Sequence, residues 1–208
     1  MDVTVITGHR ENASLLDEMY RLRAKIFVQR LGWSVQSNKG FEVDEFDLPQ
    51  TRYILVLFQG RVVGCARFLD FDGPTMVGSH FSSLVDHPIA SLTHEAIESS
   101  RFCVDTEALR KQGEGLSAQA TALLISAMIG WAALHQYQTI VTVTDVAIER
   151  LLRRLDVPFA RLGQPQNIET TRAVAGCVDV AAALGCKIMP PQLCASASLP
   201  TQQRSPAQ

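Results

Sequence analysis

The chain has 208 residues, a formal net charge of −2 and 19% charged residues. This length suits one domain with a substantial core, and the near-neutral charge argues against a nucleic-acid partner. Five cysteines without a CxxC pair predict neither a metal site nor a disulfide framework. We see no apolar run of the roughly 18 to 20 residues needed to span a bilayer and no signal peptide, so we expect a cytoplasmic protein without membrane insertion.

The first predicted elements are a short strand and an amphipathic helix. Residues 3–7 are rich in β-formers and predict the strand. Apolar residues at steps of three and four predict a helix over about 13–30, and they are Leu15, Met19, Leu22 and Ile26. An irregular loop follows and runs to about residue 47.

Charged and aromatic residues gather in this helix and loop. Arg23 and Phe27 lie one turn apart on the helix, and Trp33, Asp44 and Asp47 follow. Such residues suit a small ligand that carries both signs of charge. A surface helix followed by a solvated acidic loop is the alternative.

A β-hairpin is predicted next. Two β-rich runs, 53–58 and 61–69, are separated only by Gln59 and Gly60. Arg67 stands late in the second run among apolar residues. A buried arginine needs an anionic partner, so Arg67 is a candidate site residue; an edge-strand arginine facing water is the alternative.

Residues 97–104 predict a strand that carries Glu98 and Arg101. A spacing of three puts two side chains on opposite faces of a regular strand. If both serve one site, a β-bulge near residues 99–101 must re-aim one of them. A cross-strand charge arrangement is the alternative. A turn region at 70–78 and a short helix at 88–96 precede this strand.

The C-terminal half alternates helices and strands. Residues 116–136 are apolar nearly all round, so we expect a buried helix there. A strand over 139–144, a helix over 146–155 capped by Asp145, strands over 158–162 and 171–178, and a helical turn over 179–185 follow. Together, the predicted helices and strands indicate a three-layer α-β-α sandwich with a mixed, mostly antiparallel sheet. We expect one domain over 1–194 and a disordered tail over 195–208.

Nine residues resemble in order and approximate spacing the invariant set of the acyl-homoserine-lactone synthases, the autoinducer synthase family of bacterial quorum sensing. They are Arg23, Phe27, Trp33, Asp44, Asp47, Arg67, Phe81, Glu98 and Arg101. The segments FVQRLGW, EVDEFD, GRVVGCARFL and EAIESSRFCVD also look like blocks of that family. The resemblance covers about residues 3–190.

The resemblance implies a fold similar to the GCN5-related N-acetyltransferases. It implies that an acyl thioester, carried by acyl-carrier protein or coenzyme A, N-acylates S-adenosylmethionine. The product then closes to a lactone and releases methylthioadenosine. Both reactants are substrates, so no resident cofactor is expected. An ordinary acetyl-coenzyme-A-dependent N-acetyltransferase of the same fold is the alternative.

S-adenosylmethionine carries an ammonium, a carboxylate and a sulfonium group. Asp44 and Asp47 can hold its cationic groups, while Arg23 or Arg101 can hold its carboxylate. Phe27 and Trp33 can wall the pocket and face the sulfonium. Glu98 and Arg101 are the candidate catalytic residues, with Glu98 as the general base.

The acyl donor is expected to contact other segments. Arg110, Gly113 and Gly115 fit the acetyltransferase pyrophosphate loop R-x-x-G-x-G before a helix; a plain glycine turn is the alternative. One helix face carries three arginines, and they are Arg150, Arg153 and Arg154. Their positive charge suits docking of an acidic carrier protein. A helix face that is simply exposed to solvent is the alternative.

The acyl chain is expected to contact Arg67, Phe81, Thr142 and Thr144, which are grouped as structural or acyl-pocket residues. The two threonines lie where family members that accept 3-oxo chains carry threonine. A hydroxyl there can donate to a 3-oxo group. Strand propensity alone also explains threonine at these positions.

Overall fold

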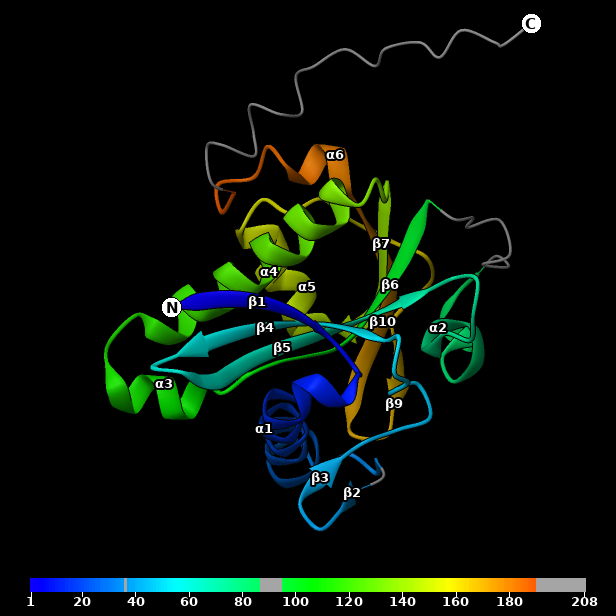
Figure 1. The fold of residues 1–208 in the computed structure, drawn as a ribbon. Helices are drawn as coiled ribbons and strands as arrows, with labels where there is room; N and C mark the ends of the chain where they lie inside the picture. The colour runs from blue at the N-terminus through cyan, green and yellow to red at the C-terminus, as the bar shows by residue number, and fades with distance from the viewer. Residues whose placement is uncertain (36, 87–94, 190–208) are drawn as a thin grey trace, which may run out of the picture.

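A twisted sheet runs through the middle of the molecule (Figure 1). The computed structural model describes residues 1–35, 37–86 and 95–189. The strand order is β1-β4-β5-β6-β7-β10-β8, with β9 paired to β10. Neighbours are antiparallel except β6 and β7, which run parallel. The strands are β1 (Asp2–Thr7), β4 (Arg52–Phe58), β5 (Arg61–Asp70), β6 (Ala96–Val104), β7 (Thr139–Asp145), β8 (Phe159–Arg161), β9 (Gln166–Ile168) and β10 (Thr171–Asp179).

Helices cover both faces of this sheet, as Figure 1 shows. Ile54 and Val56 of β4 pack in one core cluster with α4, whereas Tyr53 and Leu55 pack in another with α1. This alternation along one strand separates two helical layers and confirms the predicted sandwich. The helices are α1 (Ala13–Arg23), α2 (Met76–Ser79), α3 (Thr106–Gln112), α4 (Leu116–Leu134), α5 (Val146–Arg154) and α6 (Val180–Ala183).

The helix predicted over residues 13–30 changes its geometry halfway. It is α-helical over Ala13–Arg23 and π-helical over Ala24–Arg30 (η2). The Leu31 N–H donates to the carbonyl of Ile26 over 3.0 Å, a step of five residues. A π-helical turn is wider than an α-helical one and occurs often at functional sites. The apolar period alone did not indicate this change.

The predicted bulge in β6 is confirmed. Cys65 of β5 pairs with Cys103, but Arg67 pairs with Ser100, so β6 holds one extra residue between these pairs. Arg101 lies in this extra stretch with φ +53°. The bulge turns Arg101 toward the α1 face of the sheet, the side on which Glu98 also lies.

Helix α4 is strongly apolar, as its sequence indicated. Only one side of the helix is buried, although we expected a buried helix. Leu124 and Ile129 are buried, whereas Leu134 at its end is 79% exposed. By length and composition α4 is apolar enough to cross a membrane, so the expectation that the chain has no such run was wrong. Core helices of globular proteins pass that test too, and α4 packs against strands of the sheet.

Some elements were not predicted. Helix α2 overlaps the predicted turn region and is capped by Thr75, whose hydroxyl accepts from the Gly78 N–H. Helix α3 begins at Asp105, which caps the Ala108 N–H over 3.1 Å. Strand β9 and the small ribbon of β2 (Ser37–Asn38) and β3 (Phe41–Glu42) were also missed. Most of the predicted helix 88–96 and the tail 195–208 lie outside the described residues.

Candidate active site

Three arginines and three carboxylates form one cluster on the α1 face of the sheet. They come from α1, β3 and the loop after it, β5 and β6. Charges removed from water must be paired and hydrogen-bonded, and equal numbers of both signs meet this need. The members are Arg23, Glu42, Asp44, Asp47, Arg67 and Arg101.

Arg23 and Arg67 are fully buried and hold the cluster together. Arg23 binds Asp47 through two hydrogen bonds of 2.8 and 2.9 Å and binds Glu42 through Nε. Arg67 donates to Asp47 over 2.9 Å and to both oxygens of Asp44. Since Arg23 and Asp47 already satisfy one another, the structure leaves little of either to a ligand.

Arg101 is the arginine of the cluster that is closest to solvent, with 9% of its side chain exposed. It donates to Glu42 over 3.0 Å and pairs with Asp44 over 2.7 Å. Its guanidinium also lies 5.7 Å from the centre of the Phe27 ring. The bulge therefore delivers Arg101 to a position between the carboxylates and an aromatic wall.

Asp47 remains ionised at every physiological pH. Burial alone raises the pKa of this carboxyl, but the charges and hydrogen bonds of Arg23, and then the charge of Arg67, hold the pKa well below its ordinary value. The same anion, after burial, raises the pKa of Tyr53, whose hydroxyl donates to Asp47 over 2.8 Å.

Phe27 and Trp33 form the aromatic wall of the site. Their rings are stacked, with centroids 5.1 Å apart and planes 7° from parallel. Phe27 comes from the π-helical segment and is buried, whereas Trp33 is only partly buried. The predicted pair is thus brought together beside Arg101.

Glu98 lies 1% exposed under the first turn of α2. Its carboxylate accepts a hydrogen bond of 3.0 Å from the Val77 N–H. Burial raises the pKa of Glu98 to about 7, although the Val77 N–H and the charge of Arg67 oppose the rise. A carboxyl with such a pKa can take up and release a proton near neutral pH.

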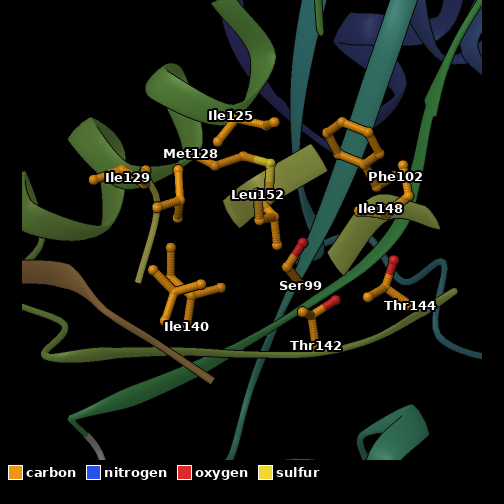
Figure 2. Close-up of a pocket in the computed structure, with 12 residues that line it drawn as sticks. Ser99, Phe102, Ile125, Met128, Ile129, Ile140, Thr142, Thr144, Ile148 and Leu152 are labelled. Atoms are coloured by element: carbon orange, nitrogen blue, oxygen red, sulfur yellow. The ribbon is translucent and has the colours of Figure 1, made fainter. Parts of the chain in front are cut away.

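A mostly apolar cavity of about 50 Å³ lies on the opposite, α4 face of the same strand. Figure 2 shows the hydroxyls of Ser99, Thr142 and Thr144 on one side of it, facing Ile125 and Met128 of α4. The Ser99 hydroxyl is buried and has no hydrogen-bond partner within the described part of the chain. A polar ligand atom in the cavity would satisfy it.

Strands β6 and β7 separate beside this cavity. Their pairing ends at Ser99 and Thr142, although β6 continues to Val104 and β7 to Asp145. Phe102 and Thr144, which line the cavity, lie beyond the last pair. The sheet is therefore open between the two strands, next to Glu98 on one face and Ser99 on the other.

The structure places the remaining predicted residues in several different parts of the molecule. Arg67 belongs to the charged cluster, and Phe81 packs against Phe46 and Met76; neither lines the cavity. Gly115, with φ +78°, is the N-cap of α4. On α5, Arg153 pairs with buried Glu149 over 2.7 Å. Other donor-docking candidates are exposed or at the end of α3, namely Arg110, Gly113, Arg150 and Arg154.

Sequence reasoning missed several members of the site. Glu42 binds Arg23 and Arg101 yet was passed over in the segment EVDEFD. Counting charges could have found it, because three buried arginines require a third anion. Met76, whose sulfur contacts Arg67 and Arg101 over 3.1 and 3.4 Å, gave no such signal.

Comparisons with known proteins agree with this geometry. The sequence profile of the autoinducer synthase family matches residues 7–186. A probable acyl-homoserine-lactone synthase of Sinorhizobium fredii (strain NBRC 101917 / NGR234) is 43% identical over 179 residues, which cover 85% of this chain and 86% of that protein.

Solved structures of similar proteins also superpose on this chain. The synthase LasI superposes with a TM-score of 0.77 at 31% identity and covers 89% of this chain and 96% of its own. TofI, in a ternary complex with an inhibitor and MTA, gives 0.79 at 27% identity and covers 93% and 100%.

Fold and site together define an acyltransferase with an open, mixed sheet. The chain belongs to the autoinducer synthase family, and it is an acyl-homoserine-lactone synthase, an enzyme that makes a quorum-sensing signal.

Proposed function

We propose that this enzyme N-acylates S-adenosylmethionine with an acyl thioester, closes the product to a lactone and releases methylthioadenosine. One observation carries the proposal: Glu98 lies beside the charged cluster on one face of β6, and the mostly apolar cavity lies on the other face, where β6 and β7 part. The two substrates can thus meet at the gap in the sheet. Both are consumed, so no resident cofactor is required.

The amino-acid part of S-adenosylmethionine suits the exposed edge of the charged cluster. Arg101 is the better partner for its carboxylate, because the guanidinium of Arg23 is completely buried and bound to Asp47 and Glu42. Asp44, with 8% of its side chain exposed, is likewise better placed than Asp47 to meet the ammonium group. Arg23 and Asp47 then serve as the support that fixes both.

The sulfonium suits the stacked pair of Phe27 and Trp33. A cation over an aromatic face gains roughly 0.5–2 kcal/mol. The family relative TofI was crystallised with MTA, the abbreviation used for the nucleoside by-product of this reaction. This supports a nucleoside site in this chain, and we assign it to the wall formed by Phe27 and Trp33.

Glu98 is proposed as the general base. The ammonium group must lose a proton before its nitrogen attacks the thioester carbon and expels the thiolate. A carboxylate with a pKa of about 7 accepts that proton at neutral pH, directly or through one water. Lactone closure needs no further base, because the ligand's own carboxylate displaces the sulfonium at its γ-carbon. There the enzyme supplies orientation.

The acyl chain is proposed to fill the cavity beneath α4. The hydroxyls of Ser99, Thr142 and Thr144 are the polar groups of its lining, so they suit an oxygen on the chain, such as a 3-oxo group. Acyl-carrier protein and acyl-coenzyme A are both possible donors. The exposed Arg150 and Arg154 favour the acidic carrier protein.

The enzyme is proposed to work in the cytoplasm. The five cysteines include no CxxC pair and predict no disulfide framework, which suits a reducing compartment.

Incubation with S-adenosylmethionine and a mixture of acyl donors tests the proposal. We expect methylthioadenosine and an acyl-homoserine lactone, whose mass gives the chain. The Glu98→Gln protein is the matched control and should form little of either. Transfer of an acetyl group from acetyl-coenzyme A without methylthioadenosine would instead support an ordinary N-acetyltransferase.

A further inference from the structure

Trp33 is held in place from two sides by residues far apart in the chain. Its ring stacks on Phe27, and its indole Nε1–H donates to the Thr171 hydroxyl over 2.8 Å. The next residue, Ser34, donates its backbone N–H to the Glu169 carboxylate over 3.1 Å. Two neighbouring residues of the N-terminal third are thus bound to one short segment of the C-terminal third.

That segment is the tip of the β9–β10 hairpin. Ile168 pairs with Thr171 across the ribbon, so Glu169 and Thr170 form its turn. Glu169 has φ +49°, a conformation that non-glycine residues rarely adopt. Strand β10 behind the tip is paired with β7 from Ala173 to Asp179. A side chain at the tip is therefore carried by a rigid element, unlike one on a free loop.

The hydrogen bond from Trp33 to Thr171 fixes the rotation of the indole ring, which stacking on Phe27 alone does not fix. Stacking holds the plane of the indole but permits the ring to rotate and slide within that plane. An indole has one hydrogen-bond donor, and Thr171 engages it. The orientation of the ring is then set, and its apolar surface rather than its N–H is available to a ligand.

We propose that the tip of the β9–β10 hairpin is a clasp and that Thr171 is a positioning residue for Trp33. By fixing the indole, Thr171 shapes the aromatic wall against which the sulfonium and adenosine of S-adenosylmethionine rest. The inference depends on the proposed function in placing that substrate at Trp33. The far end of strand β10 also contributes Val178 to the acyl cavity, so this one strand contributes to the walls of both proposed substrate sites.

Kinetics and fluorescence of variants test the clasp. The chain has two tryptophans, so a Trp131→Phe enzyme serves as the reference in which Trp33 alone emits. Thr171→Val keeps the shape of the side chain but removes the hydroxyl, Thr171→Ser keeps the hydroxyl, and the exposed Thr170→Val is the matched control. We expect Thr171→Val to raise the KM for S-adenosylmethionine about three- to tenfold, the usual cost of one hydrogen bond.

The other readouts separate positioning from general damage. In Thr171→Val, kcat should change little and iodide should quench Trp33 more strongly, while Thr171→Ser and Thr170→Val should match the reference. Glu169→Ala, which removes only the bond to Ser34, should raise the same KM by a smaller factor. Unchanged KM and quenching in both Thr171→Val and Glu169→Ala would overturn the clasp, as would equal effects in Thr170→Val.

Failure of the proposed function gives a different result. If S-adenosylmethionine leaves the Trp33 fluorescence of the reference enzyme unchanged, the substrate does not rest on this wall and the premise is wrong. If it changes that fluorescence with equal affinity in the reference and in Thr171→Val, the premise stands and only the clasp is refuted.

Discussion

Glu98 and Arg101 are three residues apart in β6 and nevertheless serve the same face of the sheet. The extra residue between the Cys65–Cys103 and Arg67–Ser100 pairs reverses the alternation of the strand, and Arg101 adopts φ +53° there. In a regular strand Arg101 would point into the apolar cavity beneath α4. The bulge therefore places the proposed base and the proposed carboxylate-binding arginine on the same face of the sheet.

Replacing Glu98 by Gln should slow acylation while leaving substrate binding intact. The amide keeps the size of the side chain but cannot accept the proton from the ammonium group. We expect kcat to fall by about 10²–10⁴-fold, the usual contribution of a general base. Methylthioadenosine release and calorimetric binding of S-adenosylmethionine measure the two effects, with the exposed Glu107→Gln as control. Equal losses of binding and turnover would refute the assignment.

The pKa of Glu98, about 7, predicts a pH profile. Below this value the carboxyl is protonated and inactive as a base, so log kcat/KM should rise with a slope of one up to about pH 7. Glu98→Gln should lose this limb and retain any limb that belongs to the substrate amine. The free energy of unfolding has the opposite pH dependence. The stabilisation that protonated Glu98 contributes is complete below its ordinary pKa of 4.5 and is lost as pH rises through about 7.

The sequence correctly predicted those structural features that a single side-chain pattern determines. The 3.6-residue and two-residue periods placed the main helices and strands, and the odd spacing of Glu98 and Arg101 required a bulge. The period could not reveal the π-helical segment, because widening by one residue preserves the apolar face. The sequence also could not reveal individual ion pairs. Asp44 and Asp47 were assigned to a ligand, although Arg67 and Arg23 already bind them.

Replacing Asp47 by Asn should destabilise the fold. The change leaves Arg23 and Arg67 buried with too little negative charge, and breaking such a pair costs about 3–5 kcal/mol. Urea unfolding measures the loss, and Glu107→Gln, in an exposed pair with Lys111, should show none. Because the folded pKa of Asp47 is depressed, its contribution is present above pH 3.8 and is lost as pH falls toward the folded value.

A different result would change the role of Asp47. If Asp47→Asn remains as stable as the parent enzyme but binds S-adenosylmethionine weakly, the carboxylate contacts the ligand directly. The charged cluster would then open when the substrate binds, since the side chain of Asp47 is completely buried in the structure described above.

Replacing Ser99 by Ala should alter substrate choice without weakening the fold. The hydroxyl is buried without a partner, so its removal should leave the melting temperature unchanged or higher. In competition between a 3-oxo donor and the unsubstituted chain, we expect preference for the 3-oxo donor to fall about three- to tenfold. Thr142→Val should act in the same direction. Thr139→Val, on β7 outside the cavity lining, is the control, and an unchanged product ratio would refute this role of the cavity hydroxyls.

Charge reversal on α5 should distinguish the two classes of acyl donor. Arg150 and Arg154 are exposed, whereas Arg153 is paired with Glu149, so we choose the double variant Arg150→Glu, Arg154→Glu. If an acidic carrier protein docks here, the KM for the acylated carrier should rise at least about tenfold, and added salt should weaken parental binding. The KM for acyl-coenzyme A should stay the same, and Arg61→Glu on the β4–β5 hairpin should affect neither donor. An unchanged KM for the carrier would place its docking surface elsewhere on the enzyme.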